Sequence, residues 1–429
     1  MNVNMMQKIF IFLFYFIIIF LNLNCSTGSS PLVDDKLSIE PIFIDATKSY
    51  FKTTSTNLSD EYEIRLFRDD SLISISKSLN SNIMITDSNL LPGHYYSYYA
   101  TQHLKNSGIS TRSNKVDINT LDTTSQIFDI KTDLFGHIGS HLRDVHIFSP
   151  SEIWAVGGIY DGDELYGALI WDGSSWVSKN LIWDEAHIQP NDFFSFNNDK
   201  IWLTGGSIFY YQQDSLELSY LRDIVNKQSM SRSWGVSENN LFSVGNHGTI
   251  LDYDGQEWHN LNINSDDGFI DISGYANSED DINLWVIGNN SIIYYDGSSW
   301  TNLIDEIRSY FTEYFIPTAV FASNNINGVL VALAMPTKSV IFFLSPKIIY
   351  PVVLFECDFY VRAISATDLN DILIAGDFIR FSHFNGVQSK EFYDYEGVGY
   401  LFGVDILNNI SIIVGQVSNY SSIIITITR

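Results

Sequence analysis

The chain has 429 residues, a length that predicts more than one folded domain. Its 45% hydrophobic content is enough for packed cores, and many Tyr and Phe residues with few Pro favour strands and turns over helices. The formal net charge of −26 argues against nucleic acid and anionic membrane as partners. No window has a convincing 3.6-residue apolar period, so we predict an all-β protein.

The N-terminus has the pattern of an export signal. A short, weakly basic lead precedes an apolar run from Ile9 to Leu21, which is short for a membrane span and suits a secretory signal. The run ends shortly before Cys25, and Ser, Thr and Gly follow. This resembles a bacterial lipoprotein signal peptide over residues 1–24, which implies that Cys25 carries a lipid and that residues 25–36 form a flexible tether. Plain secretion with cleavage nearby, or an uncleaved anchor, is the alternative.

Residues 37–121 contain short alternating runs separated by turn residues, the strand density of a small β-sandwich. The Leu-Leu-Pro-Gly string at 90–93, followed by Tyr96, resembles the E–F corner of fibronectin type III domains. The resemblance implies that the Tyr96 hydroxyl bonds the corner backbone and that Phe51 stands in for the family's strand-B tryptophan. It also implies a spacer or adhesion module.

From Ser125 to Arg429 the chain repeats one string: an apolar or aromatic residue, two small or apolar residues, then Gly. Successive copies begin 39 to 48 residues apart, the length of one four-stranded propeller blade. One copy has Ala334 where the others have Gly. The copies begin at Trp154, Trp202, Phe242, Trp285, Val331, Leu373 and Ile412.

A second string, aromatic-Asp-Gly-x-x-Trp, accompanies the first, as in Tyr253–Trp258. Asp-Gly between apolar strands predicts a hairpin, because the central residues need positive φ. The last repeat is one strand short, and residues 125–131 ahead of the first repeat supply that strand and close the ring. The paired strings resemble seven-bladed propellers, among them photosystem assembly-factor propellers. We therefore predict a fibronectin type III-like domain over 37–121 and a seven-bladed β-propeller over 125–429.

We find no phosphate loop, metalloprotease motif or nucleophile elbow, so we predict no catalytic residues and no cofactor. His137 and His141 have the spacing of metal ligands, and the acidic run 161–164 falls short of a calcium loop; we interpret both as polar loops and predict no metal. The two cysteines, Cys25 and Cys357, cannot build a disulfide framework. We expect Cys357, in an apolar run, to be buried.

Two features suggest a binding site. Arg143, Arg232 and Arg362 occupy the same place in three repeats, 10 or 11 residues before the aromatic or Leu. This predicts that all three lie at the mouth of the central channel. There they would hold a carboxylate or phosphate. The alternative, which the sequence alone favours, is that each arginine pairs with a local acid such as Asp144, Asp358 or Glu356.

Loops that could share that face are rich in aromatic residues, which suit protein or carbohydrate recognition where they are exposed. The alternative is packing between blades. The candidate binding residues are Arg143, Arg232, Arg362, Trp183, Trp234, Tyr310, Tyr314 and Tyr360; the other aromatic and His candidates are His187, Phe311, Phe315, Phe359 and Tyr400.

These observations predict an extracytoplasmic lipoprotein, anchored to a membrane only through its N-terminal lipid, whose propeller is a non-catalytic scaffold for a protein or glycan. A polysaccharide hydrolase or lyase with its site in the channel is one alternative, and it requires converging carboxylates or a His/Tyr pair there. An assembly factor that grips a client protein is another.

Overall fold

The computed structural model describes residues 37–56, 62–78, 81–104, 110–223, 228–261, 263, 265–278, 281–392, 398–417 and 421–429. The predicted signal peptide, Cys25 and the tether lie outside these residues. The chain divides into a smaller unit that ends at Asn119 and a larger unit that starts at Thr120, to which the segments 45–47 and 91–94 also belong. No helix in the described part of the chain has the length and apolar content needed to cross a membrane.

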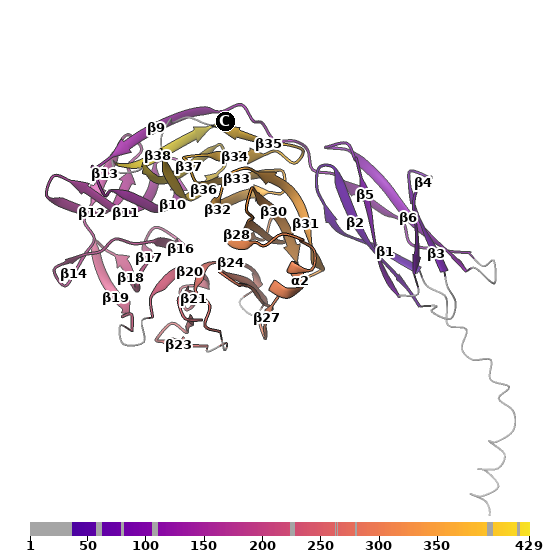
Figure 1. The fold of residues 1–429 in the computed structure, drawn as a ribbon, viewed down its shortest axis with the longest axis horizontal. Coiled ribbons are helices and arrows are strands. Elements are labelled where there is room, and N and C mark those ends of the chain that lie inside the picture. Colours follow the sequence, from indigo (N-terminus) through magenta and orange to yellow (C-terminus); the bar gives the residue numbers. More distant parts are fainter. Residues whose placement is uncertain are drawn as a thin grey trace, which may run out of the picture. The chain divides into compact units, whose positions relative to one another are not determined.

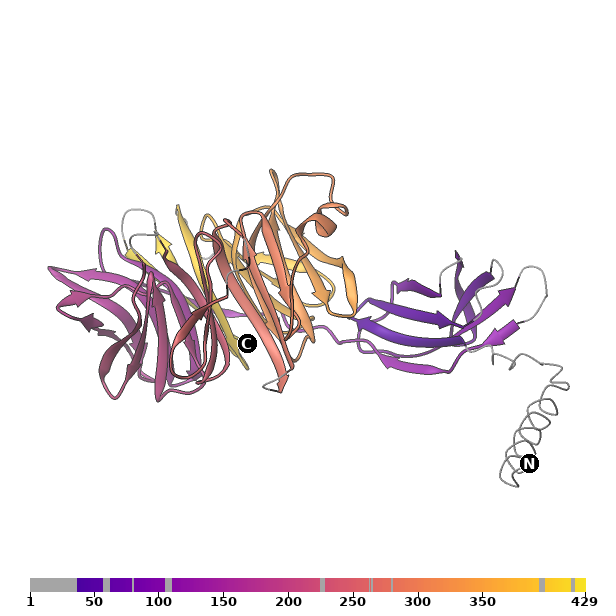
Figure 2. The ribbon, with the colours of Figure 1, turned by 90° about the horizontal axis from the view of Figure 1, so that it is seen from below.

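The smaller unit consists of two antiparallel sheets (Figure 2). One has the strand order β1-β2-β5; the other has the order β4-β3-β6-β7, with β8 also paired to β6. The strands are β1 (Leu37–Ile44), β2 (Lys48–Ser55), β3 (Tyr62–Arg68), β4 (Ser71–Ser78), β5 (Asn82–Ser88), β6 (Tyr95–Leu104), β7 (Ser110–Arg112) and β8 (Val116–Asn119).

Both sheets contribute alternate residues to one core. Phe51 is fully buried on β2, and its ring centroid lies 4.4 Å from that of Tyr98. That Phe51 stands in for a fibronectin type III tryptophan stays a prediction. The Tyr98 hydroxyl donates to Asp87 at 2.7 Å, and Arg68 pairs with the same carboxylate. Tyr96, the predicted corner residue, is buried in this core as well; the predicted bond from its hydroxyl to the corner backbone stays a prediction.

The larger unit contains seven four-stranded antiparallel sheets within the described residues. We number them sheet 1 to sheet 7 in chain order. Their innermost strands are β10 (His141–Ser149), β16 (Asp192–Ser195), β20 (Met230–Ser237), β24 (Phe269–Ser278), β28 (Ile316–Ser323), β32 (Val361–Asp368) and β36 (Gly399–Leu407). The second strands are β11 (Glu152–Asp161), β17 (Lys200–Gly205), β21 (Asn240–Gly245), β25 (Asp281–Gly288), β29 (Gly328–Ala334), β33 (Asp371–Gly376) and β37 (Ile410–Val417).

The third strands are β12 (Glu164–Trp171), β18 (Ser207–Gln212), β22 (Ile250–Tyr253), β26 (Ser291–Tyr295), β30 (Ser339–Ser345), β34 (Phe381–Phe384) and β38 (Ser421–Thr428). The outermost strands are β13 (Trp176–Lys179), β19 (Ser215–Tyr220), β23 (Trp258–Asn260), β27 (Trp300–Asn302), β31 (Ile348–Cys357), β35 (Ser389–Phe392) and β9 (Asp129–Phe135). A short hairpin, β14 (Ile182–Trp183) with β15 (Ala186–His187), and the helix α2 (Ile304–Arg308) lie in connections between sheets.

The sheets form a closed ring around a common centre (Figure 1). Each innermost strand contacts the innermost strand of the next sheet, and β36 contacts β10. The last sheet is completed by β9, which pairs with β38 from Ser422↔Phe135 to Thr428↔Asp129. This confirms the predicted closing strand, although β9 begins later than residue 125. The edge of the last sheet is therefore paired by the start of the unit rather than left open.

Two details of the predicted repeats are resolved by strand register. In sheet 5 the residue opposite Pro317 is Leu333, whereas in sheet 1 Gly157 stands opposite Leu142. Leu333 therefore occupies the glycine position, and the assignment of Ala334 to it was wrong by one residue. Cys357 is buried at the end of β31, as predicted, and burial raises the pKa of its thiol to about 12.

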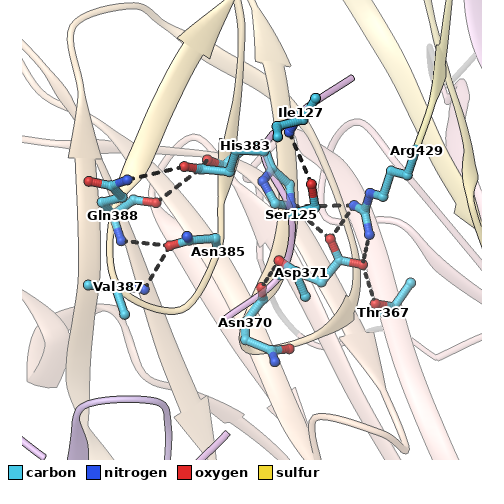
Figure 3. A network of polar contacts seen from close by, with 12 residues as sticks. Ser125, Ile127, Thr367, Asn370, Asp371, His383, Asn385, Val387, Gln388 and Arg429 are labelled. Atoms are coloured by element: carbon cyan, nitrogen blue, oxygen red, sulfur yellow. Dashed lines mark hydrogen bonds and ion pairs between the residues drawn. The ribbon is translucent and has the colours of Figure 1, made fainter. Parts of the chain in front are cut away.

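A buried polar network joins sheet 7 to sheet 6 (Figure 3). Asp371, in the second strand of sheet 6, accepts hydrogen bonds from Arg429 at 2.8 Å, from the Thr367 hydroxyl at 2.5 Å and from His383 Nε2 at 2.7 Å. Burial alone would raise the pKa of Asp371, but these donors outweigh burial and hold the pKa well below its ordinary value. Arg429 follows β38 directly, so the network fastens the last sheet to its neighbour.

We predict that Asp371→Ala lowers the free energy of unfolding by about 3 kcal/mol, because the buried His383 and the largely buried guanidinium of Arg429 lose their shared partner. The pKa of Asp371 is depressed, so its contribution is present at neutral pH and is lost as the pH falls below about 4. Chemical denaturation at pH 7 and at pH 3 measures both effects. Asp214→Asn, which removes the charge of an exposed carboxylate paired with Lys179, is the matched control and should change the free energy of unfolding much less.

Candidate functional site

One pocket opens where the innermost strands begin. Six of the seven innermost strands have a register irregularity close to their first residue, and the side chain at that irregularity turns towards the centre of the ring. In sheet 2, Asn191 immediately precedes β16 and takes the same place. The pocket has a volume of about 420 Å³. Its lining from these equivalent positions is Arg143, Asn191, Ser231, Ile270, Thr318, Arg362 and Phe402; Arg232, Asn289 and Tyr360 complete it.

The three predicted arginines do meet at this pocket, but they are not equivalent. Arg143 and Arg362 sit at the irregularity itself, whereas Arg232 is the residue after it. Arg232 pairs with Val244 across its sheet, as Asp144 pairs with Val156. Arg232 therefore occupies the repeat position that Asp144 occupies in sheet 1. The prediction that all three arginines occupy one repeat position was wrong by one residue.

Arg232 is held by aspartates from three other sheets. Its guanidinium lies 2.9 Å from Asp192 and 3.2 Å from Asp144, and Asp271 lies 3.8 Å away. Burial alone would lower the pKa of Arg232, but the three carboxylates outweigh burial and raise it. Arg232 therefore has acidic partners, but they come from three other sheets, so the alternative expectation of a local acid does not describe this arginine.

The same carboxylates also join neighbouring sheets. Asp144 accepts the backbone N–H of Phe193 at 3.1 Å, in the next sheet, and Asp192 accepts that of Ser233 at 2.7 Å. Asp271 accepts the N–H of Val320 in the same way. Burial raises the pKa of Asp192 to about 7 and that of Asp271 to about 6, although Arg232 opposes the shift in both.

Arg143 differs from Arg232 because no carboxylate pairs with it within the described residues. Its guanidinium carbon lies 4.2 Å from the centroid of the Phe402 ring, and its Nε is buried without a hydrogen-bond partner in that part of the chain. Burial and repulsion from Arg362 and Arg232 lower the pKa of Arg143. An anion beside Arg143 would stabilise its charged form and so oppose this lowering of the pKa.

Arg362 is paired, but with an acid that was not predicted. Its Nε donates to Asp377, while Asp358 pairs with Arg380 and Glu356 pairs with Lys338. The rings of Tyr360, Tyr400 and Phe402 surround the Arg362 guanidinium at 4.9, 4.9 and 5.7 Å. No carboxylate lines the pocket within the described residues, so its charged groups are guanidinium groups.

The predicted aromatic residues separate into three groups. Tyr360 lines the pocket. Trp183 and Trp234 are partly buried against cores that span neighbouring sheets, so the packing alternative describes them. The ring of Trp183 lies against Phe209, and that of Trp234 lies against Phe242, its cross-strand neighbour. Tyr310 and Tyr314 are 51% and 65% exposed but are not part of the pocket lining. The remaining candidates are Phe311 and Phe315, which pack in a core, Phe359, which is buried, His187, which bonds the carbonyl of Leu165, and Tyr400, which touches Arg362.

The metal candidates make local backbone contacts. His137 Nε2 lies 3.0 Å from the carbonyl of Gly162, and His141 Nδ1 lies 3.0 Å from that of Gly139. Across the described residues, no cluster of three His, Cys, Asp or Glu side chains could hold a metal ion.

Phe402, Asp192 and Asp271 are among the site residues that sequence reasoning missed. All three follow from the repeat once it is aligned on the irregularity: Phe402 holds the place of Arg143, and Asp192 and Asp271 hold that of Asp144. The one-residue difference in spacing between Arg232 and the other arginines was the available signal.

No family model matches this chain, and no curated protein matches it. Solved structures do match. One is YCF48 bound to D1 peptide, with 11% identity, a TM-score of 0.54, and coverage of 72% of this chain and 99% of that one. Another is the WD40 β-propeller domain of Doa1, with 13% identity, a TM-score of 0.52, and coverage of 71% and 98%. At these identities the likeness establishes the fold: the larger unit is a β-propeller.

We predict that the folding stability of the Asp192→Asn variant rises relative to that of the wild type as the pH rises. The folded-state pKa of Asp192, about 7, lies above its unfolded value of about 3.9, so folding takes up a proton between these values. The contribution of Asp192 is therefore complete below about pH 4 and is lost as the pH passes 7. Melting temperatures of both proteins at pH 5 and pH 8 test this. The difference should stay constant for Asp214→Asn, and a constant difference for Asp192→Asn would contradict the prediction.

Proposed function

We propose that the chain is an extracytoplasmic lipoprotein whose propeller is a non-catalytic binding scaffold, and that its pocket receives an anionic group of a protein partner. The observation that carries the proposal is Arg143, a half-buried cation with no carboxylate partner in the described residues, beside Phe402 and Arg362 in a pocket of about 420 Å³. A carboxylate that enters would meet guanidinium donors and no competing acid on the wall. A glycan carrying an acidic sugar offers the same group, and is the alternative partner.

The strongly acidic protein around the pocket makes this arrangement selective. With a net charge of −26, most of the surface repels an acidic partner, so attraction is confined to the place where arginines are gathered. Aromatic residues at the rim, such as Tyr360 and Tyr400, are 37% and 38% exposed and suit contact with a peptide. YCF48, a propeller of similar fold, is described as bound to a peptide, which is compatible with the assembly-factor form of this proposal.

The finer architecture belongs to the same proposal. The seven four-stranded sheets and the pairing of β9 with β38 support seven blades with the strand at 129–135 as the closure of the last one. The two-sheet smaller unit, with Phe51 and Tyr98 in its core, supports a fibronectin type III-like spacer over 37–121. Residues 1–24 would then be the signal peptide and 25–36 the tether.

The hydrolase alternative requires carboxylates that converge in the channel. Asp144, Asp192 and Asp271 do converge, but each accepts a backbone N–H of the next sheet and all three surround Arg232. None of them lines the pocket. These contacts give the three aspartates a structural role as links between sheets. This favours the binding role of the propeller over general acid–base chemistry.

We predict that Arg143→Ala weakens binding of an acidic peptide by 10- to 100-fold, because a charge-assisted hydrogen bond contributes about 1.5–3 kcal/mol. The measurement is a peptide array of 12-residue sequences with and without Asp/Glu clusters, followed by calorimetry on the best acidic peptide. Arg143→Lys should recover only part of the affinity, because it keeps the charge and loses the planar fork.

The control for this experiment is Arg65→Ala, which removes a partly exposed arginine of the smaller unit and should leave binding unchanged. Affinity should also fall with added salt. Equal affinity of wild type and Arg143→Ala for every acidic peptide, or no preference for acidic over neutral sequences, would overturn the proposed role of the pocket.

The lipid anchor has its own test. Cys25→Ser should abolish incorporation of radiolabelled palmitate in a bacterial host and move the protein from the membrane fraction to the soluble fraction, because no other cysteine precedes the folded units. Cys357→Ser, at the buried cysteine, is the matched control and should retain the label. Unchanged labelling of the Cys25 variant would contradict the lipoprotein assignment.

A further inference from the structure

At three seams between neighbouring sheets, an aromatic ring of one sheet's second strand packs against aromatic rings of the next sheet. Trp202, on the second strand of sheet 2, lies 5.4 Å from Tyr253 and 6.1 Å from Trp258 of sheet 3, measured between ring centroids. Phe242 in sheet 3 lies 6.1 Å from Tyr295 of sheet 4. Four sheets carry an aromatic residue at this register position: Trp154, Trp202, Phe242 and Trp285.

At the seam where sheet 7 meets sheet 1, the same position holds Ile412. The receiving pair is nevertheless aromatic: Trp171 and Trp176, the register counterparts of Tyr253 and Trp258, have ring centroids 5.7 Å apart. A pocket of about 230 Å³ lies where the missing ring would be, and we call it the seam pocket. Its lining is Lys131, Asp133, Pro150, Ile153, Trp171, Trp176, Ile410, Ile412 and Thr426.

The size and the walls of the seam pocket suit one aromatic ring. An apolar cavity of about 150 Å³ in a protein interior binds benzene, so 230 Å³ accommodates a phenol or an indole. Isoleucine side chains and tryptophan rings provide most of the lining, which disfavours a sugar ring because its hydroxyl groups would find few partners. The other seams of this chain show directly that an aromatic side chain fits between such rings.

We propose that the seam pocket binds an aromatic side chain of a partner peptide that carries Lys or Arg next to it. The ring would take the place that Trp202 and Phe242 hold at other seams.

Charged residues beside the seam pocket are the reason for expecting Lys or Arg next to the aromatic residue. Asp133 is at the rim, where Lys131 pairs with it at 2.8 Å, and Asp172 follows Trp171 directly in the turn that joins the two tryptophans. Hydrogen bonds from Ser174 and Ser175 lower the pKa of Asp172 to about 2, so it stays ionised. Lys131 balances Asp133, so the excess negative charge beside the pocket comes from Asp172 and from the net charge of −26, which favours a basic segment over an acidic one.

The seam pocket is separate from the arginine pocket. Ile153, Trp176 and Ile410 lie at the starts of second and fourth strands, whereas Arg143 and Arg362 lie near the starts of first strands. In an antiparallel sheet these are opposite ends of the strands. The two pockets therefore open at opposite ends of the propeller. Binding at the seam pocket does not depend on the proposed function of the arginine pocket.

The test uses the full-length protein and the peptide acetyl-Lys-Lys-Trp-Lys-Lys-amide, with binding followed by saturation-transfer NMR of the peptide ring protons. We expect binding at least tenfold tighter than that of the same peptide with Ala for Trp, and no binding of the version with Glu for Lys. Ile412→Trp should weaken binding at least tenfold because it fills the pocket from within, and Trp176→Ala should do the same because it removes a wall.

The matched control is Val177→Ala, which changes a half-exposed neighbour of Trp176 outside the pocket lining and should leave binding unchanged. Arg143→Ala should also leave it unchanged. If Ile412→Trp does not fold, Ile412→Phe serves in its place, with melting temperature as the check on folding. Equal binding of the Trp and Ala peptides, unchanged binding by a folded Ile412 variant, or pocket-dependent binding of N-acetylglucosamine in place of the peptide would overturn the proposal.

Discussion

Arg232 is the residue on which the centre of the propeller depends. One guanidinium is shared by carboxylates from sheets 1, 2 and 4, and each of those carboxylates also accepts a backbone N–H from the following sheet. Three buried acids without this cation would repel one another in a region that water solvates poorly. The ion cluster thus ties several innermost strands together at the level just below the pocket.

This arrangement also decides what the pocket can do. Arg143 has no carboxylate partner among the described residues, Arg362 pairs with Asp377 through its Nε, and Phe402 lies beside both guanidinium groups. Arg232 and Arg143 differ by a shift of one residue relative to the strand irregularity. Arg232 lies among three aspartates, whereas Arg143 lies on the pocket wall without a carboxylate partner in the described residues.

Much of the larger unit could be predicted from the chain alone, because hairpin turns and strand periods are local signals. The Asp-Gly turns and the spacing of the glycine strings located the repeats, and the surplus strand ahead of them was found paired with β38. The partners of the arginines could not be predicted in the same way. Asp192 and Asp271 are about 40 residues from Arg232 in either direction, and only the ring closure brings them within reach. The seam pocket could not be predicted from the sequence either, because only the strand register shows that Ile412 occupies the position that Trp202 holds in sheet 2.

We expect Arg143 and Arg362 to bind an anion in the pocket and Arg232 not to bind one. Anomalous diffraction from a crystal of the protein soaked in bromide tests it most directly, because it locates an anion whatever the natural partner is. We predict a bromide peak between the guanidinium groups of Arg143 and Arg362, beside Phe402, and none at Arg232. A bromide bound at Arg232, or an ordered carboxylate of the protein against Arg143, would contradict the account.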